Sequence, residues 1–226
     1  MKRLIVLGFL FAVSAHAEVL DRSAVIGGMN VQYRVVLPQP YDSGRTYPGV
    51  LAFVGGGQTY EMVRNEVDRT WKPEAERRGY IVVLPAAPDG QLFFEKGDHI
   101  FPQFLDQLLK DYKIEGAKFH IAGHSNGGLS AFHIAAKYPR YFRTLTGFPG
   151  YLPEDENADA IKPMCIFMHV GERDLVWQGA MEPEMERLKA RGFRIQYKVE
   201  PKEPHLIQAL QGAGVKRLFD QFESCK

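Results

Sequence analysis

This sequence has no excess of either positive or negative charge. Its 226 residues include 28 lysines and arginines against 27 aspartates and glutamates, so the formal net charge is +1. Proteins that bind nucleic acids or other polyanions usually carry a marked basic excess. Glycine (22 residues) and proline (14 residues) are spread along the chain rather than gathered in one tract, which argues against a disordered segment. The composition therefore predicts a globular protein with no nucleic-acid partner.

Apolar runs long enough to cross a bilayer are also missing, since a membrane-spanning helix needs about 18 to 20 apolar residues. The run over residues 4–13 is too short. It follows two basic residues and precedes Ala15-His16-Ala17, whose small residues have the spacing that signal peptidase accepts. We predict a signal peptide over residues 1–17, one domain over residues 18–226, and a secreted or periplasmic protein with no membrane span after cleavage. The alternatives for this run are an anchor helix or a first core strand.

Cysteine is scarce, with only Cys165 and Cys225 in the chain. In an oxidising compartment spare thiols tend to pair, so a disulfide at the C-terminus is one interpretation. In the other, Cys165 packs as a small apolar residue and Cys225 stays unpaired. Histidines and cysteines do not show the short regular spacing of zinc ligands, so neither a metal nor another cofactor is expected.

What the sequence does contain is a regular alternation of two patterns, apolar runs of strand length and amphipathic stretches of helix length. This alternation predicts an α/β fold, with a mostly parallel central sheet and helices on both faces. The widest gap between elements, residues 148–162, is too short for a large lid. Strands are expected over residues 31–37, 49–54, 80–84, 118–122, 144–147, 163–170 and 193–199, and helices over 60–78, 100–112, 127–137, 179–191 and 205–222.

The most specific motif is Gly123-His124-Ser125-Asn126-Gly127-Gly128, which lies between an apolar run and a helical stretch. A serine on a sharp strand-to-helix turn needs glycines two residues to either side, because a Cβ there would meet the adjoining backbone. The start of the helix also directs N–H groups and partial positive charge at the hydroxyl. Ser125 is therefore the predicted nucleophile. The alternative is a glycine-rich turn without chemistry.

A serine nucleophile needs a general base, and the base needs an acid that fixes its tautomer. His205 follows the last predicted strand and is the predicted base. Asp174 follows the strand over residues 163–170 and is the predicted acid, because catalytic groups collect at the carboxyl ends of parallel strands. Glu172 on the same turn is the second candidate.

Acyl transfer also needs two N–H donors for the carbonyl oxygen as it becomes negative. We expect one from the backbone of Asn126, directly after the nucleophile. The other is expected from the glycine-rich turn after the strand over residues 49–54, with Gly56 preferred over Gly57. A flexible loop with no donor role is the alternative for this turn.

The remaining histidines have less specific interpretations. His124 is next to the nucleophile and is expected to support its turn or to line the pocket. Structural roles are expected for His99, His120, His133 and His169.

With these motifs in this order, the chain resembles the α/β-hydrolase superfamily over nearly all of its length after residue 17. Gly-His-Ser-Asn-Gly-Gly is similar to the nucleophile turn of small secreted esterases of the polyhydroxybutyrate depolymerase, feruloyl esterase and dienelactone hydrolase-like groups. The resemblance implies a small-molecule ester substrate, an acyl-enzyme on Ser125 and no cofactor. One residue departs from the pattern: Val54 stands where many relatives have the histidine of His-Gly-Gly-Gly.

Two other functions remain open on the sequence. A prolyl-oligopeptidase-like peptidase uses the same fold and order of residues, but those enzymes usually carry a large extra domain. A hydrolase-like binding protein without catalysis usually lacks one of the three catalytic residues, and all three are present here. Aromatic residues expected near the pocket, as substrate contacts or as core, are Tyr60, Phe93, Phe94, Phe148, Tyr151 and Trp177.

Overall fold

The computed structural model describes residues 17–153 and 156–225. The predicted signal peptide lies outside the described residues, apart from Ala17. Eight strands form one sheet in the order β1-β2-β4-β3-β5-β6-β7-β8. The strands are β1 (Glu18–Ile26), β2 (Met29–Leu37), β3 (Gly49–Phe53), β4 (Ile81–Pro85), β5 (Phe119–Gly123), β6 (Phe142–Gly147), β7 (Cys165–Gly171) and β8 (Arg194–Glu200).

The sheet is mostly parallel, as the sequence predicted. Strands β4, β3, β5, β6, β7 and β8 pair in parallel, whereas β1 and β2 form an antiparallel hairpin that joins β4 at one edge. Every central position of β3, β4 and β5 is buried. Such continuous apolar strands are typical of a sheet that is covered on both faces.

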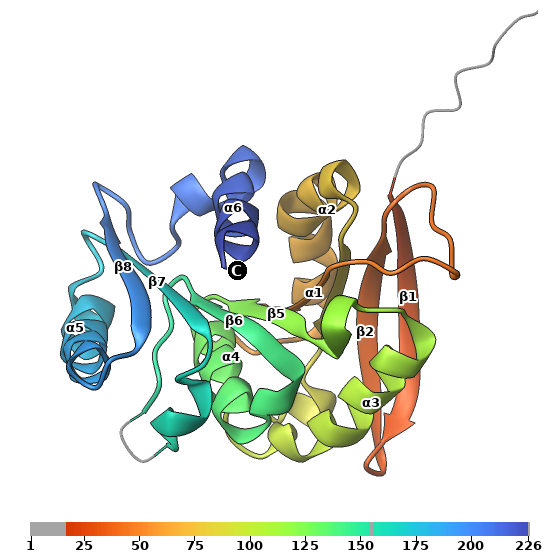
Figure 1. Cartoon of the computed structure of the whole chain (residues 1–226), viewed down its shortest axis with the longest axis horizontal. Helices are drawn as coiled ribbons and strands as arrows, with labels where there is room; N and C mark the ends of the chain where they lie inside the picture. The colour runs from red at the N-terminus through yellow and green to blue at the C-terminus, as the bar shows by residue number, and fades with distance from the viewer. Residues whose placement is uncertain (1–16, 154–155, 226) are drawn as a thin grey trace, which may run out of the picture.

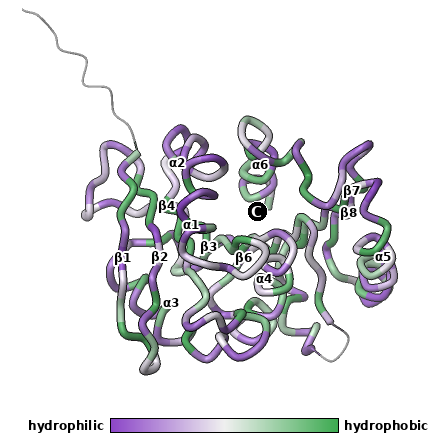
Figure 2. The backbone as a smooth tube through the Cα atoms, turned by 180° about the vertical axis from the view of Figure 1, so that it is seen from behind, coloured by the Kyte–Doolittle hydropathy of each residue, from purple (hydrophilic) through white to green (hydrophobic). Residues whose placement is uncertain are grey.

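Helices cover both faces of the sheet (Figure 1). On one face α1 (Tyr60–Glu66), α2 (Lys72–Arg78) and α6 (Lys216–Ser224) pack over one apolar core, and on the other α3 (Phe101–Asp111), α4 (Asn126–Lys137) and α5 (Leu175–Ala190) pack over a second. Apolar residues are concentrated in the strands, while the outer turns of α2 are mostly polar (Figure 2). No helix in the described residues is long and apolar enough to cross a membrane.

The structure differs from the prediction in three elements. Strand β1 was not predicted, because its exposed face carries polar residues at the edge of the sheet. The helix predicted over residues 60–78 is interrupted by a π-helical turn, Val67–Trp71. The helix predicted over residues 205–222 was wrong in its first half, because α6 begins only at Lys216. Gly212 in the preceding stretch has φ +51°, which ends regular helix.

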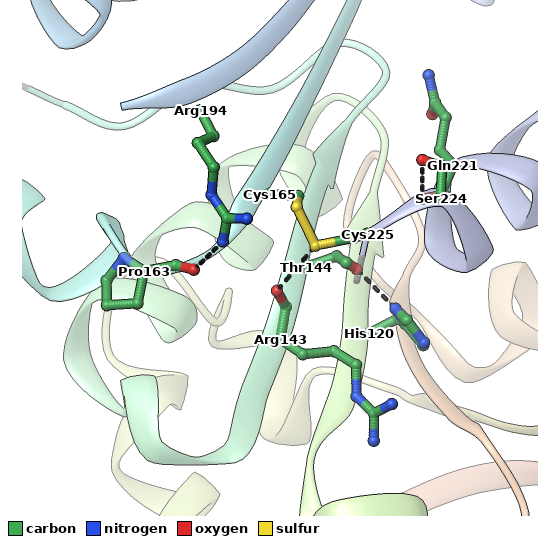
Figure 3. The surroundings of a disulfide bond; sticks show 9 residues. All are labelled: His120, Arg143, Thr144, Pro163, Cys165, Arg194, Gln221, Ser224 and Cys225. Atoms are coloured by element: carbon green, nitrogen blue, oxygen red, sulfur yellow. Dashed lines mark hydrogen bonds between the residues drawn. A yellow bond between two sulfur atoms is a disulfide. The ribbon is translucent and has the colours of Figure 1, made fainter. Parts of the chain in front are cut away.

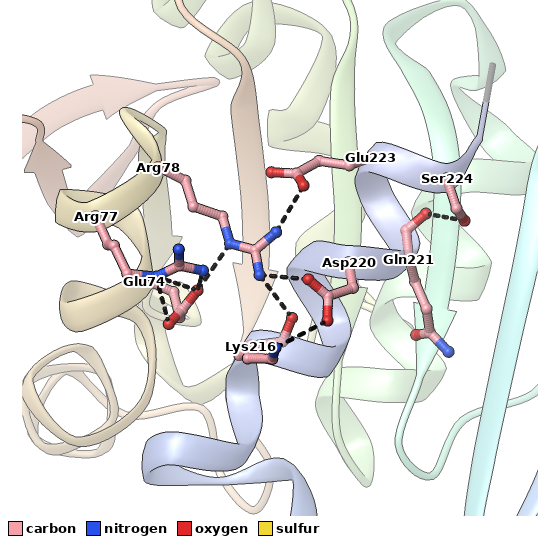
Figure 4. Close-up of polar contacts among 8 residues, drawn as sticks. All are labelled: Glu74, Arg77, Arg78, Lys216, Asp220, Gln221, Glu223 and Ser224. Atoms are coloured by element: carbon pink, nitrogen blue, oxygen red, sulfur yellow. Dashed lines mark hydrogen bonds and ion pairs between the residues drawn. The ribbon is translucent and has the colours of Figure 1, made fainter.

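Two sets of contacts hold the C-terminal segment. Cys165 at the start of β7 and Cys225 after α6 form a disulfide, with their Cα atoms 6.0 Å apart (Figure 3). On the other side of α6, Arg78 of α2 bonds Asp220 at 2.5 Å and Glu223 at 2.7 Å (Figure 4). Helix α6 is therefore tied to the sheet and to α2, which anchors the chain that follows residue 205.

Candidate active site

Ser125 lies on a strained turn between β5 and α4. Its φ of 56° and ψ of −127° lie where non-glycine residues are rare. A Cβ on Gly123 would lie 2.1 Å from the Gly127 carbonyl oxygen, and one on Gly127 would lie 2.4 Å from the Phe53 carbonyl oxygen. Only glycine at these two positions lets the start of α4 approach the ends of β5 and β3 this closely.

The structure brings Ser125, His205 and Asp174 together although they are far apart in the sequence. His205 Nε2 lies 2.9 Å from Ser125 Oγ, and His205 Nδ1 lies 2.6 Å from Asp174 Oδ2. The Asp174 side chain is 9% exposed and that of His205 is 42% exposed. A carboxylate only accepts hydrogen bonds, so Nδ1 carries the proton and Nε2 is free to accept from the serine hydroxyl.

Backbone contacts between two loops explain why Asp174 and His205 meet. Arg173 N–H donates to the Glu203 carbonyl oxygen at 2.9 Å, and Glu172 N–H donates to the Glu200 carbonyl oxygen at 3.0 Å. A Cβ on Gly171 would lie 2.2 Å from the Pro204 carbonyl oxygen, so the turn after β7 packs directly against the loop after β8. The parallel pairing of β7 with β8 brings both loops to the same edge of the sheet.

Glu172, the second candidate for the acid, contacts a different group. Its Oε2 accepts the N–H of Lys202 at 2.7 Å. Lys202 has φ +63°, an unfavourable conformation for a side chain of this type. Glu172 therefore stabilises the bend of the loop that carries His205, and the acid next to the imidazole is Asp174.

The two predicted oxyanion donors lie on facing segments. Asn126 is the first residue of α4, where N–H groups have no acceptor within the helix. Gly56 lies on the turn after β3, and its carbonyl oxygen accepts from Asn126 Nδ2 at 2.9 Å. Neither the Gly56 nor the Asn126 N–H has an acceptor among the described residues, and the same is true of Gly57. All three groups are therefore free to bind an oxyanion.

A cavity of 240 Å³ adjoins the turn that carries Gly56. Arg69, from the π-helical turn, lines this cavity and also a second hollow of 440 Å³ that reaches Leu206, next to His205. Arg69 was not predicted, because it lies in a π-helical turn inside the stretch expected to be helical (residues 60–78). The lining residues of the first cavity are Val54, Gly55, Gly56, Met62, Asn65, Glu66, Arg69 and His124.

His124 lines this cavity and directly precedes Ser125 in the chain. Burial lowers the pKa of His124, the negative charge of Glu66 opposes that shift, and the neighbouring His205 and Arg69 add to it. A Cβ on Gly55 would lie 2.7 Å from His124 Nε2, so the imidazole packs against the backbone of the glycine turn. This contact agrees with a role in lining the pocket.

Three other histidines have polar partners away from Ser125. His120 bonds Thr144 Oγ1 at 2.8 Å, and burial lowers its pKa to about 3. His169 bonds Glu200 at 2.8 Å, and His133 bonds Asp98 at 2.9 Å. Among the described residues, no three histidine, cysteine, aspartate or glutamate side chains cluster in a way that could hold a metal.

Of the predicted aromatic contacts, Trp177 lies against His205, and Phe148 lies against His124 with ring centroids 5.8 Å apart. The Trp177 ring centroid lies 5.3 Å from that of His205 and 5.7 Å from that of Tyr151. Phe93 and Phe148 are buried in the two cores. Tyr60 bonds Asp21 at 2.6 Å. Trp177 and Tyr151 therefore form an aromatic wall on one side of the imidazole.

Comparisons with known proteins agree with this geometry. No family model matches the chain. Over 138 residues (58% of this chain and 45% of the relative) it is 30% identical to the ferri-bacillibactin esterase BesA of Bacillus subtilis strain 168. Over 140 residues (54% of this chain and 20% of the relative) it is 28% identical to dipeptidyl-peptidase 5 of Porphyromonas gingivalis strain ATCC 33277. The chain thus spans less than half the length of either relative.

Solved structures match over more of the chain. A ferulic acid esterase superposes with a TM-score of 0.72 at 14% identity, over 92% of this chain and 98% of that one. The S-formylglutathione hydrolase of Agrobacterium tumefaciens superposes with a TM-score of 0.67 at 15% identity, over 99% of this chain and all (100%) of that one. The chain has the α/β-hydrolase fold.

Proposed function

We propose that the protein is a serine hydrolase that cleaves carboxylic esters through an acyl-enzyme on Ser125. The observation that carries the proposal is the unbroken line of hydrogen bonds from Ser125 Oγ through His205 to Asp174, with Ser125 on a turn of positive φ. A nucleophile, a base and a group that orients the base are the three parts that acyl transfer requires.

In the proposed reaction Ser125 Oγ attacks the ester carbonyl carbon while its proton moves to His205 Nε2. The carbonyl oxygen becomes negative and accepts hydrogen bonds from the Asn126 N–H and the Gly56 N–H. When the carbon–oxygen bond to the alcohol breaks, His205 returns the proton to the leaving oxygen. Water, deprotonated by His205, then attacks the acyl-enzyme, and the proton goes back to Ser125 as the acid leaves. Asp174 stabilises the imidazolium in both halves.

Esters are favoured over peptides as the substrate class because similar proteins of known structure include several esterases. The match to a dipeptidyl-peptidase supports a peptidase as the second candidate, although this chain covers only 20% of that protein. Dipeptidyl p-nitroanilides, assayed beside p-nitrophenyl esters of increasing chain length, methyl ferulate and short polyester oligomers, distinguish the two. A higher kcat/KM on the anilides would favour the peptidase.

The acyl-enzyme is tested by rapid quenching with p-nitrophenyl acetate and intact-mass measurement. We expect a gain of one acetyl group, located by peptide mapping at Ser125 and absent from Ser125→Ala. Ser23→Ala, which changes an exposed serine of β1, is the matched control and should acetylate normally. Turnover without any acetylated intermediate, or with full rate in Ser125→Ala, would contradict the proposal.

The proposal includes export, with cleavage after Ala17. The Cys165–Cys225 disulfide supports it, since disulfides persist mainly in oxidising compartments. Expression of the full chain with a C-terminal tag, followed by fractionation and N-terminal sequencing, tests this. We expect a periplasmic or secreted protein that begins at Glu18. A cytoplasmic protein that begins at Met1 would refute export and leave the proposed chemistry untouched.

A further inference from the structure

The glycine turn that carries one proposed oxyanion donor lacks the side chain that the resemblance leads one to expect. Val54 occupies the position of the histidine in His-Gly-Gly-Gly. Its side chain is buried, with 2% exposure, and it offers neither a donor nor an acceptor. Other groups must therefore fix the turn, because an oxyanion donor is effective only when it is held in place before the charge develops.

A first tether runs from the start of α4 to the turn. Asn126 Nδ2 donates to the Gly56 carbonyl oxygen at 2.9 Å. The same residue supplies the other proposed donor through its backbone N–H. Asn126 thus carries one proposed donor on its backbone, and its side chain holds the peptide group between Gly56 and Gly57, next to the Gly56 N–H.

A second tether is buried beneath the first. Gln58 is 0% exposed and has φ +51°, an unfavourable conformation that its contacts must stabilise. Gln58 Nε2 donates to Ser130 Oγ at 2.8 Å, and Ser130 Oγ donates to the Asn126 carbonyl oxygen at 2.9 Å. These two hydrogen bonds therefore connect the glycine turn to Asn126, the residue whose side chain also forms the first tether.

Gln58 is itself held by neighbouring backbone. Its Oε1 accepts the Phe93 N–H at 3.3 Å, and its carbonyl oxygen accepts the Ala87 N–H at 2.8 Å. Its N–H donates to the Gly55 carbonyl oxygen at 3.3 Å. The Gln58 side chain is therefore held rigidly, and its hydrogen bond to Ser130 fixes the glycine turn relative to α4.

We propose that Gln58, Ser130 and the side chain of Asn126 are positioning residues that set the separation between the Gly56 N–H and the Asn126 N–H, in place of the missing histidine. This inference rests on the proposed esterase function. Because the two donors act on the charge that develops in the transition state, loosening them lowers kcat and leaves KM nearly unchanged.

Two variants test the two tethers separately. Ser130→Ala breaks the buried tether by removing one hydroxyl. Asn126→Ala breaks the exposed tether and keeps the backbone N–H that binds the oxyanion. For each we expect kcat on p-nitrophenyl acetate to fall at least tenfold while KM changes less than twofold. The affinity for an alkyl boronate, which forms a tetrahedral adduct with a serine hydroxyl, should fall by the same factor as kcat/KM.

Thr144→Val is the matched control, because it also removes a buried hydroxyl that makes a hydrogen bond, here of 2.8 Å to His120. It should lower the melting temperature and leave kcat and boronate affinity unchanged. If Ser130→Ala and Asn126→Ala behave like this control in a wild-type protein that hydrolyses esters, the positioning role is refuted and the esterase function stands. A wild-type protein without hydrolysis or boronate binding would refute the proposed function instead.

Discussion

Replacing Asp174 by asparagine removes a charge from the proposed site with almost no change of shape. The 2.6 Å bond between Asp174 Oδ2 and His205 Nδ1 holds the imidazole in the tautomer whose Nε2 accepts the serine proton. An amide can turn an N–H toward Nδ1, which moves the ring proton to Nε2 and blocks that acceptance. In the substituted protein, the imidazolium of the proposed reaction also lacks the carboxylate of Asp174, whose side chain is 9% exposed.

We expect Asp174→Asn to lower kcat on p-nitrophenyl esters about 10⁴-fold, the loss found when a triad aspartate is replaced in this way. A factor of that size is about 5 kcal/mol of transition-state stabilisation. Stopped-flow and steady-state assays at neutral pH measure it, and circular dichroism checks that the fold is intact.

Glu172→Gln is the control for this experiment. Its side chain can still accept the Lys202 N–H, so kcat should change less than threefold. Near-normal turnover in Asp174→Asn, together with a large loss in Glu172→Gln, would refute the assignment of the acid.

Three further predictions concern the scaffold. Cys225→Ser opens a link between residues 60 apart and should cost about 4 kcal/mol of unfolding free energy in urea titrations; equal stability with and without reductant would contradict this. Gly127→Ala places a Cβ 2.4 Å from the Phe53 carbonyl oxygen and should abolish most activity, whereas Gly179→Ala, with open space around it, should keep activity and gain up to about 1 kcal/mol. Burial lowers the pKa of His120 to about 3 in the folded protein. As the pH falls below about 6.5, His120 therefore takes up a proton in the unfolded chain but not in the folded protein, and the free energy of unfolding decreases. Between pH 7 and pH 5 the wild type should lose about 2 kcal/mol more of its free energy of unfolding than His120→Gln does. Urea titrations at both pH values measure this loss, and an equal loss in the two proteins would exclude the prediction.

The sheet and the turn that carries Ser125 were predictable because their signals are local. Buried parallel strands appear as continuous apolar runs, and the glycines around Ser125 follow from the close approach of α4 to the sheet. The order of motifs along the chain was enough to select His205 and Asp174 as partners. The backbone hydrogen bond between Arg173 and Glu203 that helps to bring those two loops together has no local signal.

Other features depend on contacts between distant segments. Strand β1 is an edge strand with polar residues on its exposed face, so its pattern resembles that of a loop. Ile207, Leu210 and Val215 have helical spacing but lie in or beside short 3₁₀ turns that are packed on the core. Gln58 and Ser130 are 72 residues apart, and nothing in the sequence of either indicates that they are bonded.

Labelling with a fluorophosphonate probe tests the central claim most directly, because the probe reacts with a serine only when a neighbouring base activates it. We predict stoichiometric labelling of the native protein at Ser125, none in Ser125→Ala and strongly reduced labelling in His205→Ala. A native protein that stays unlabelled, or one whose label lies on another serine, would contradict the account.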